Sequence, residues 1–231
     1  MTATIRRASA RFTDRADGRV THHAFSFGQH YDPEHASFGP MLCHDDHLLG
    51  SGRGFDPHRH ADLEVVSWVV SGALVHGDET GDTAVVEPGS VAVLSAGAGT
   101  SHAEHSRTDG PTRFVQVWLT PDERGTTPSY DVVPVDLVRN ELVPVAAGDG
   151  SAPARVGVAG ATFSVARLDE GATLALPEAP LVHVFVATGA LVRSSLAEPL
   201  SAGDALLLTD ETGRAVTAAV PTELLVWTFT G

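Results

Sequence analysis

The sequence predicts an all-β fold made of two related β-units in tandem. Short runs of apolar or alternating residues recur along the 231-residue chain, with Gly, Pro, Asp and Ser between them. This pattern is typical of β-sandwiches and barrels. Long helical periodicity is absent. The tetrapeptide Gly-Ala-Leu-Val occurs at residues 72–75 and again at 189–192, which indicates an internal repeat.

Eight apolar runs are predicted to be strands. Each is short and bounded by turn residues, as expected for strands buried on one or both faces. The runs are residues 65–70, 84–86, 91–94, 114–119, 162–167, 181–187, 205–208 and 223–228. Residues 141–147 are expected to form a short helix, although Pro144 counts against it because proline disrupts helix interiors.

The repeat divides the chain into two units. After each copy of the tetrapeptide, a short turn leads to a second matched segment, residues 87–94 in the first half and 200–208 in the second. Residues 146–153 are small and flexible in composition and are interpreted as a linker. We therefore expect an N-terminal domain at residues 1–135 and a C-terminal domain at residues 136–231.

Composition argues against several classes of function. The chain has 29 acidic and 15 basic side chains, a net charge of −14, and every basic residue is arginine. Direct nucleic-acid binding is not expected, because neutralising phosphates needs a basic surface. No apolar run is long enough for a bilayer, and the N-terminus lacks the apolar stretch of a secretory signal. The single Cys43 excludes an internal disulfide framework and a cysteine zinc site. These features predict a cytoplasmic protein without a membrane partner.

Twelve histidines are the feature that composition leaves unexplained. His58 and His60 are two residues apart, and on a strand such residues share a face at about 7 Å. His102 and Glu104 repeat this spacing. Two such strands facing each other offer three nitrogens and one oxygen. This donor set suits a divalent first-row metal and leaves positions open for substrate or oxygen.

The surroundings of the two pairs strengthen this interpretation. Gly52 stands before the first pair and Glu64 follows it, while Gly89 opens a strand that ends at the glycine-rich residues 95–99, shortly before the second pair. The glycines allow tight turns and a close backbone approach to the site. The arrangement resembles the two motifs of the cupin fold, with Ser95 where the second motif usually has a residue such as proline.

Over residues 20–131 the chain resembles the pirin family, and most closely its bacterial branch similar to quercetin 2,3-dioxygenase. The segments that carry the resemblance are residues 25–35, 54–76, 95–104, 115–121 and 127–130. It implies a bicupin, with two tandem cupin barrels of the jelly-roll, or double-stranded β-helix, type. Beyond residue 132 only this general layout supports the resemblance.

The resemblance also implies a metal site. His58, His60, His102 and Glu104 would hold one divalent ion, and Glu104 would also be the catalytic base. Many cupins outside the pirins use the carboxylate at the position of Glu64 instead. On an extended strand Glu64 lies about 13 Å beyond His60, so we expect it to have a supporting or structural role. Iron(II) is the preferred metal, and nickel, cobalt, copper, manganese and zinc accept the same donors.

One metal ion per chain is expected, in the N-terminal domain. Aligning the two units places residues without metal-binding side chains at the positions of the histidines and carboxylates, namely Ala175, Pro177, Leu181, Val216 and Ala218. The C-terminal domain is therefore predicted to lack metal ligands. His183 is expected in the core or at the rim. The other histidines outside the site, among them His76, are expected on the surface or in turns.

The resemblance implies dioxygenase activity on flavonols such as quercetin, with a small phenolic substrate and O2 as partners. Two alternatives are left open. One is a metal- or redox-sensing regulatory protein that binds a transcription factor or a metabolic enzyme, and the other is a different cupin enzyme acting on a small oxygenated molecule. Two joined units can close both sheets within one chain, which is compatible with a monomer.

Overall fold

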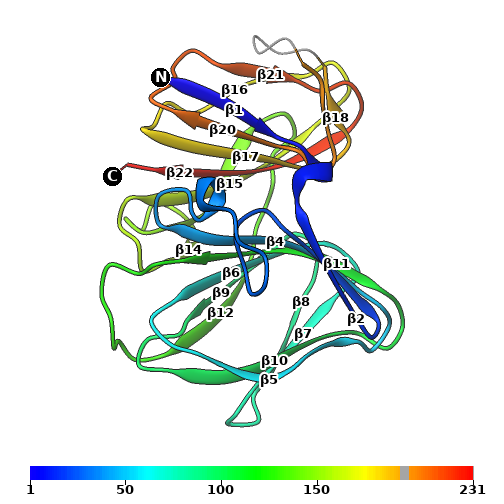
Figure 1. The fold of residues 1–231 in the computed structure, drawn as a ribbon, viewed down its shortest axis with the longest axis vertical. Coiled ribbons are helices and arrows are strands. Elements are labelled where there is room, and N and C mark those ends of the chain that lie inside the picture. The colour runs from blue at the N-terminus through cyan, green and yellow to red at the C-terminus, as the bar shows by residue number, and fades with distance from the viewer. Residues whose placement is uncertain (193–197, 231) are drawn as a thin grey trace. The chain divides into compact units, whose positions relative to one another are not determined.

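The structure is a computed structural model that describes residues 1–192 and 198–230. Strands dominate these ranges (Figure 1), and their helical elements are two short 3-10 helices, η1 (Ala8–Ala10) and η2 (Pro33–His35). The predicted all-β class is confirmed. In the same ranges no helix has the length and apolar character to cross a membrane.

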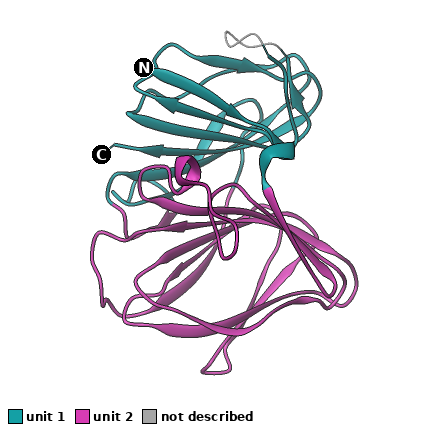
Figure 2. Ribbon diagram, viewed as in Figure 1, with its two compact units in different colours: residues 1–11, 136–153, 159–231 teal, residues 12–135, 154–158 magenta. Residues whose placement is uncertain are grey.

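The chain forms two compact units (Figure 2). The N-terminal unit comprises residues 12–135 and 154–158, and the C-terminal unit comprises residues 1–11, 136–153 and 159–231. Relative to the expected division, the first eleven residues therefore change sides. The reason is that β1 (Thr2–Arg6) pairs along its whole length with β20 (Ala205–Thr209) of the C-terminal unit. This pairing joins segments about 200 residues apart, so no local sequence pattern could predict it.

Two antiparallel sheets form the N-terminal unit. The larger sheet has the strand order β12-β9-β6-β11-β4-β3-β2 and the smaller one the order β5-β10-β7-β8. The strands of this unit are β2 (Phe12–Ala16), β3 (Arg19–His23), β4 (Met41–Leu49), β5 (Gly54–His60), β6 (Glu64–Ser71), β7 (Leu74–Asp78), β8 (Thr83–Val86), β9 (Ser90–Ser95), β10 (Thr100–Ser106), β11 (Thr112–Leu119), β12 (Ser129–Pro134) and the short β14 (Ala154–Arg155).

The C-terminal unit has the same layout. Its large sheet contains the strand order β1-β20-β17-β22-β15-β13, and β16-β21 and β18-β19 form two short pairs. Its further strands are β13 (Leu142–Ala147), β15 (Ala161–Leu168), β16 (Thr173–Ala175), β17 (Leu181–Thr188), β18 (Ala190–Leu191), β19 (Leu200–Ser201), β21 (Ala215–Thr217) and β22 (Thr222–Phe229). In the described part of the chain, the strands stay in separate sheets and do not close into continuous hydrogen-bonded barrels.

All eight predicted strands are confirmed, since each run lies within an observed strand. The predicted short helix at residues 141–147 is wrong. This segment is β13, whose pairing with β15 is irregular just after Pro144, and an irregular position tolerates a residue without an N–H group. The predicted linker is also wrong at its start, because Ala146 and Ala147 are buried within β13.

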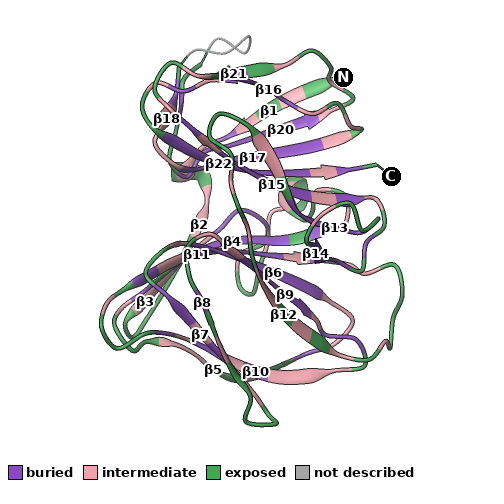
Figure 3. Cartoon of the chain, turned by 180° about the vertical axis from the view of Figure 1, so that it is seen from behind, coloured by how far each residue is buried: buried purple, intermediate pink, exposed green. Residues whose placement is uncertain are grey.

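Buried residues line the strands of both units (Figure 3), and most of them are apolar. Burial of apolar surface stabilises these sheets by about 25 cal/mol per Å². In the N-terminal unit one buried cluster consists of Leu49, Val69, Leu74, Val86, Ala92 and Phe114. In the C-terminal unit a buried cluster draws on β15, β17, β20 and β22 and on the short strands β16, β18, β19 and β21.

The first residue of the repeated tetrapeptide must be glycine in both units. The φ angle is 78° at Gly72 and 80° at Gly189, in the left-handed region that disfavours residues with a Cβ atom. A Cβ atom at either position would also overlap the carbonyl oxygen of the facing proline, Pro111 or Pro221. The same turn is therefore required in both units.

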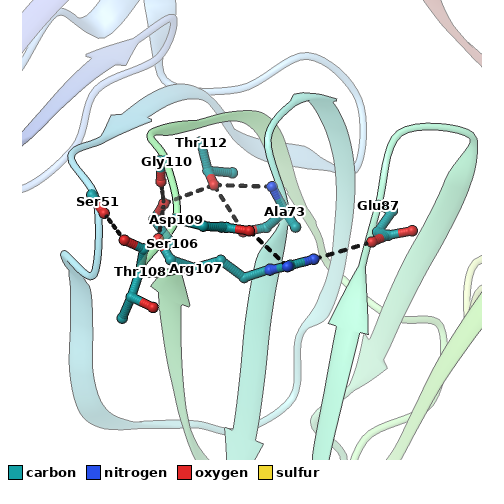
Figure 4. A network of polar contacts seen from close by, with 9 residues as sticks. All are labelled: Ser51, Ala73, Glu87, Ser106, Arg107, Thr108, Asp109, Gly110 and Thr112. Atoms are coloured by element: carbon teal, nitrogen blue, oxygen red, sulfur yellow. Dashed lines mark hydrogen bonds and ion pairs between the residues drawn. The ribbon is translucent and has the colours of Figure 1, made fainter.

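A threonine locks this turn in each unit. Thr112 Oγ1 donates to the carbonyl of Ala73 at 2.8 Å and accepts from the Ala73 N–H at 3.2 Å, within the network at the end of β10 (Figure 4). Thr222 makes the equivalent pair of contacts with Ala190, at 3.0 Å and 3.1 Å. The internal repeat is thus confirmed by geometry, including a threonine that the sequence comparison did not identify.

Candidate metal centre

Three of the four predicted site residues converge on one point in the N-terminal unit. β5 and β10 are antiparallel neighbours, with His102 directly opposite His58. The candidate ligand nitrogens of His58, His60 and His102 all lie within 4.8 Å of one another. The ring centroid of His58 is 4.5 Å from that of His102 and 4.8 Å from that of His60. The i, i+2 spacing of the first pair therefore produces the expected geometry.

The unsatisfied nitrogens in this cluster fit a metal ion. His60 and His102 are buried, and the Nε2 atom of each has no hydrogen-bond partner. A buried polar atom without a partner costs about 1–3 kcal/mol, so a cluster of such atoms needs a ligand to offset that cost. Imidazole nitrogens are ligands for iron, nickel, copper and zinc. The donor set is therefore suited to a divalent metal ion.

The imidazoles are also held in the form that binds metals. Burial lowers the pKa of His60 to about 4 and that of His102 to about 3, so both rings are neutral near pH 7. His58 Nδ1 lies 2.8 Å from the carbonyl oxygen of Asp56. Because a carbonyl only accepts, Nδ1 carries the proton and Nε2 keeps its lone pair for a ligand.

Glu104 lies beside this cluster rather than within it. Its carboxylate belongs to a second group whose ligand atoms lie within 4.8 Å of one another, formed with His76 and His102. A register irregularity between His102 and Glu104 shifts the pairing of β10 with β5, so that Glu104 faces Phe55. The predicted ligand set is thus divided. His58, His60 and His102 form one group, and Glu104 belongs to a second group, with His76 and His102.

A buried hydrogen-bond network fixes the carboxylate of Glu104. Gln116 Nε2 lies 3.0 Å from each Glu104 oxygen and 3.1 Å from Ser67 Oγ. Trp118 Nε1 donates to Gln116 Oε1 at 3.0 Å, which orients the amide with its NH2 group toward Glu104. Burial raises the pKa of Glu104 to about 7, although the Gln116 hydrogen bonds oppose this shift. Glu104 can therefore exchange a proton near neutral pH.

His76 is a site residue that the sequence interpretation missed. It was expected on the surface or in a turn, but it is buried, and its ring stacks on Tyr130 with centroids 3.6 Å apart. Its Nδ1 lies 3.3 Å from Nδ1 of His102. This contact occupies the second nitrogen of His102 and leaves Nε2 for a ligand. Alternation along β7 could have identified it, because Leu74 and His76 share the buried face.

Glu64 has the structural role expected for it. Its Oε2 accepts hydrogen bonds from Ser95 Oγ at 2.8 Å and from the Gly157 N–H at 2.9 Å. Burial raises the pKa of this carboxyl. Glu64 thereby ties residues 154–158 to the N-terminal unit. Ser95, the residue that departs from the usual cupin motif, is the hydroxyl donor in this contact.

Other histidines also differ from the expectation of surface positions. His23, His44 and His47 are buried. β4 is buried on nearly its whole length although it contains charged and imidazole side chains. Such a strand has no apolar alternation, so its burial could not be predicted from hydropathy. The expectation for His183 is confirmed, since it is fully buried in β17.

A cavity of about 460 Å³ opens beside the cluster, within the N-terminal unit. His58, Glu104 and Gln116 contribute to its lining, and Phe27, Phe55 and Trp118 supply aromatic walls. A volume of this size is typical of small-molecule sites. The cavity therefore offers a flat organic molecule direct access to the imidazole cluster.

Two of the three carboxylates that line this cavity, those of Asp14 and Asp45, are in contact with histidine. His23 Nδ1 lies 2.9 Å from Asp45 Oδ2, and its Nε2 lies 3.2 Å from Asp14 Oδ2. Burial alone lowers the pKa of His23, but the two carboxylates outweigh it and raise the pKa. His30 Nε2 also contacts Asp14, at 2.8 Å. The two aspartates of the wall are thus paired with histidines of the same wall.

The corresponding region of the C-terminal unit is apolar. β16 and β21 are three residues long, whereas β5 and β10 are seven. Their inward-facing residues are Leu174 and Val216, with Leu176 and Ala218 just beyond the strand ends. The sequence alignment is one residue out of register on β16, because Leu174 and Leu176, not Ala175 and Pro177, face the interior. In the described part of this unit no group of three metal-binding side chains occurs.

The sequence comparisons agree with this geometry. Residues 5–119 match the Pirin family. A protein named "Putative quercetin 2,3-dioxygenase" from Mycobacterium tuberculosis is 42% identical over 234 residues, which cover 98% of this chain and 96% of that protein. A protein of the same name from Pseudomonas aeruginosa is 34% identical over 210 residues, covering 88% and 89%.

Solved structures share the fold. A bacterial pirin from Escherichia coli, in complex with nickel(II), has a TM-score of 0.89 at 24% identity and is covered completely, as is this chain. A quercetin 2,3-dioxygenase from Acinetobacter baumannii has a TM-score of 0.77 at 23% identity, covering 100% of this chain and 86% of that one. The predicted bicupin architecture is thereby confirmed. With its two cupin units and its close match to these relatives along almost the whole sequence, the chain belongs to the pirin family.

Proposed function

We propose that this protein is a metal-dependent dioxygenase that acts on phenolic substrates, with flavonols such as quercetin as the first to test. One observation carries the proposal: three imidazoles cluster beside a cavity with aromatic walls, two of them buried with unpartnered Nε2 atoms, His60 and His102, and the third, His58, in the cavity lining. The names of the relatives from Mycobacterium tuberculosis and Pseudomonas aeruginosa support the reaction class. The nickel(II) complex of the Escherichia coli pirin supports a divalent metal.

His58, His60 and His102 would hold the ion, with Glu104 as the adjoining carboxylate. Iron(II) is our preferred ion, and the same donors accept nickel, cobalt, copper, manganese or zinc. When bound, a redox-active ion would bind the ionised substrate oxygen as a Lewis acid and provide a site for O2. The neutral imidazoles leave the net positive charge of such an ion available to the substrate.

Glu104 would accept the proton of the substrate hydroxyl at a carboxylate oxygen. The hydrogen bonds from Gln116 hold this carboxylate in place, and its raised pKa suits proton transfer near neutral pH. Phe27, Phe55 and Trp118 would flank the aromatic ring of the substrate and limit the access of water. These residues select a flat molecule and orient its hydroxyl toward the imidazoles.

The test is a turnover assay in air. Protein loaded separately with iron, nickel, cobalt, copper or manganese is incubated with quercetin, and loss of the flavonol absorbance is followed with product analysis. Turnover with at least one metal, lost in Glu104→Gln at unchanged metal content, is the expected result. Absence of turnover with all five metals would overturn the proposal. A cytoplasmic location stays a prediction, and it agrees with the free, buried thiol of Cys43.

A further inference from the structure

Two arginines without carboxylate partners line the cavity beside the imidazole cluster. Arg15 lies on β2 and Arg19 begins β3, and both contribute to the cavity wall. Among the described residues, neither forms an ion pair. Of the three acidic residues in the same lining, Asp14 and Asp45 are both in contact with His23, and Glu104 accepts hydrogen bonds from Gln116. The wall therefore holds two guanidinium groups without an ion pair, whereas its two aspartates are paired with histidine.

The position of Arg19 is well defined. Its NH1 donates to the carbonyl of Gly54 at 2.8 Å, and its guanidinium carbon lies 4.6 Å from the ring centroid of Phe55. The Phe55 ring in turn lies 6.3 Å from the ring of His58. Cation–π contact and one hydrogen bond fix the guanidinium while leaving further N–H donors for a ligand. A positive group thus stands one aromatic ring away from the imidazole cluster.

The charge of this wall contrasts with that of the whole molecule. The chain has a net charge of −14, so its long-range field repels anions. Unpaired arginines in a cavity of such a protein point to a local function. A guanidinium presents a planar fork of donors that matches a carboxylate, often through two parallel hydrogen bonds. A carboxylate on the ligand is therefore the group that this wall complements best.

We propose that the preferred substrates are flat phenolic acids, whose carboxylate binds Arg19 and Arg15 while a phenolic hydroxyl faces the imidazole cluster. This inference rests on the proposed function, because it assigns the substrate class of the same site. Phe55 lies near both groups, 4.6 Å from the Arg19 guanidinium carbon and 6.3 Å from the His58 ring. On this basis quercetin, which has no carboxylate, is a secondary substrate.

The test compares two ligands that differ in charge and by one methyl group, 3,4-dihydroxybenzoate and its methyl ester. Binding is measured by calorimetry on zinc-loaded protein, since zinc is redox-inactive and prevents turnover. The acid is expected to bind about tenfold more tightly than the ester at low salt. High salt should reduce this preference, because screening weakens contacts at a partly open site.

Matched variants assign the preference to these residues. Arg15→Gln and Arg19→Gln should each weaken binding of the acid more than binding of the ester and so reduce the preference for the acid, whereas Arg19→Lys should retain part of this preference. Arg124→Gln is the control, because Arg124 is exposed and outside the cavity. Equal affinities for acid and ester in the wild type, or a preference that persists in the Arg15→Gln/Arg19→Gln double variant, would overturn the inference. If the protein turns over quercetin but binds the acid and the ester equally, the inference is overturned and the proposed function stands. If the protein prefers the acid but turns over no substrate, the proposed function is overturned and the role of the arginines in carboxylate binding stands.

Discussion

The two units of this chain share one scaffold and differ in what fills it. Gln116 on β11 pairs with Ser67 on β6, and the equivalent pair in the C-terminal unit is Val226 on β22 with Val184 on β17. The glycine turn and its threonine lock occur in both units. The scaffold therefore does not require a polar interior.

The polar interior of the N-terminal unit has a stability cost that the C-terminal unit avoids. Buried imidazoles and a buried carboxyl lose hydration, which disfavours their charged forms. This loss lowers the pKa of His60 and His102 and raises the pKa of Glu104. The corresponding interior of the C-terminal unit consists of Leu and Val side chains that gain from burial. Polar side chains that are buried despite this cost indicate a functional site.

The largest expected effect separates the two units by metal content. His58→Ala or His102→Ala should abolish metal loading, because each removes one of three nitrogens from the cluster. His183→Ala in the C-terminal unit and His105→Ala on the same strand as His102 should leave it intact. Elemental analysis per mole of folded protein measures the difference, with circular dichroism as the folding control. Equal metal content in all four variants would remove the site assignment.

Exchanging the interior residues tests how far each unit depends on the polarity of its own interior. Val226→Gln buries an amide without partners in the C-terminal unit and should destabilise the protein by about 3 kcal/mol in chemical denaturation. Gln116→Leu makes the reverse change and should destabilise the protein by about 1–3 kcal/mol, because Glu104 and Trp118 lose their hydrogen-bond partner. Gln116→Leu should still reduce turnover at least about tenfold, since Glu104 loses its donors. A stable Val226→Gln protein would contradict this reading.

The pH dependence of stability should reveal the buried carboxyl. The folded-state pKa of Glu104 is raised from an ordinary 4.5 to about 7, so folding favours its protonated form. Its contribution is full below pH 4.5 and is lost as the pH rises through 7, on the order of 3 kcal/mol for metal-free protein. Denaturation of metal-free wild type and Glu104→Gln between pH 5 and 8 measures it. A constant stability difference between the two proteins would show that Glu104 does not titrate there.

The smallest expected effect tests what the two units share. Thr112→Val and Thr222→Val each remove a hydroxyl that bridges the backbone of the glycine turn. Each should destabilise its unit by about 1 kcal/mol, the usual value for one intramolecular hydrogen bond. Thermal denaturation of the two variants provides the measurement. Markedly unequal losses would indicate that the two turns are not energetically equivalent.

The strands and the imidazole cluster were predictable because their signals are local. Alternation and punctuation by turn residues predicted all eight apolar strands, and the i, i+2 spacing predicted that His58 and His60 share a face. The side chains that support the site were not predictable in this way. Gln116 and Trp118 lie within an apolar strand, and only the pairing of β11 with its neighbours brings Gln116 to Glu104.

The amino-acid sequence by itself determined the all-β class, the repeat and the candidate ligand pairs His58–His60 and His102–Glu104, because each of these signals is contained in short segments of the chain. The tertiary structure decided the rest. In the structure β1 belongs to the C-terminal unit, Glu104 lies outside the three-histidine group, and His76 contacts His102. These outcomes depend on strand register and on burial between distant segments, which short-range patterns do not encode.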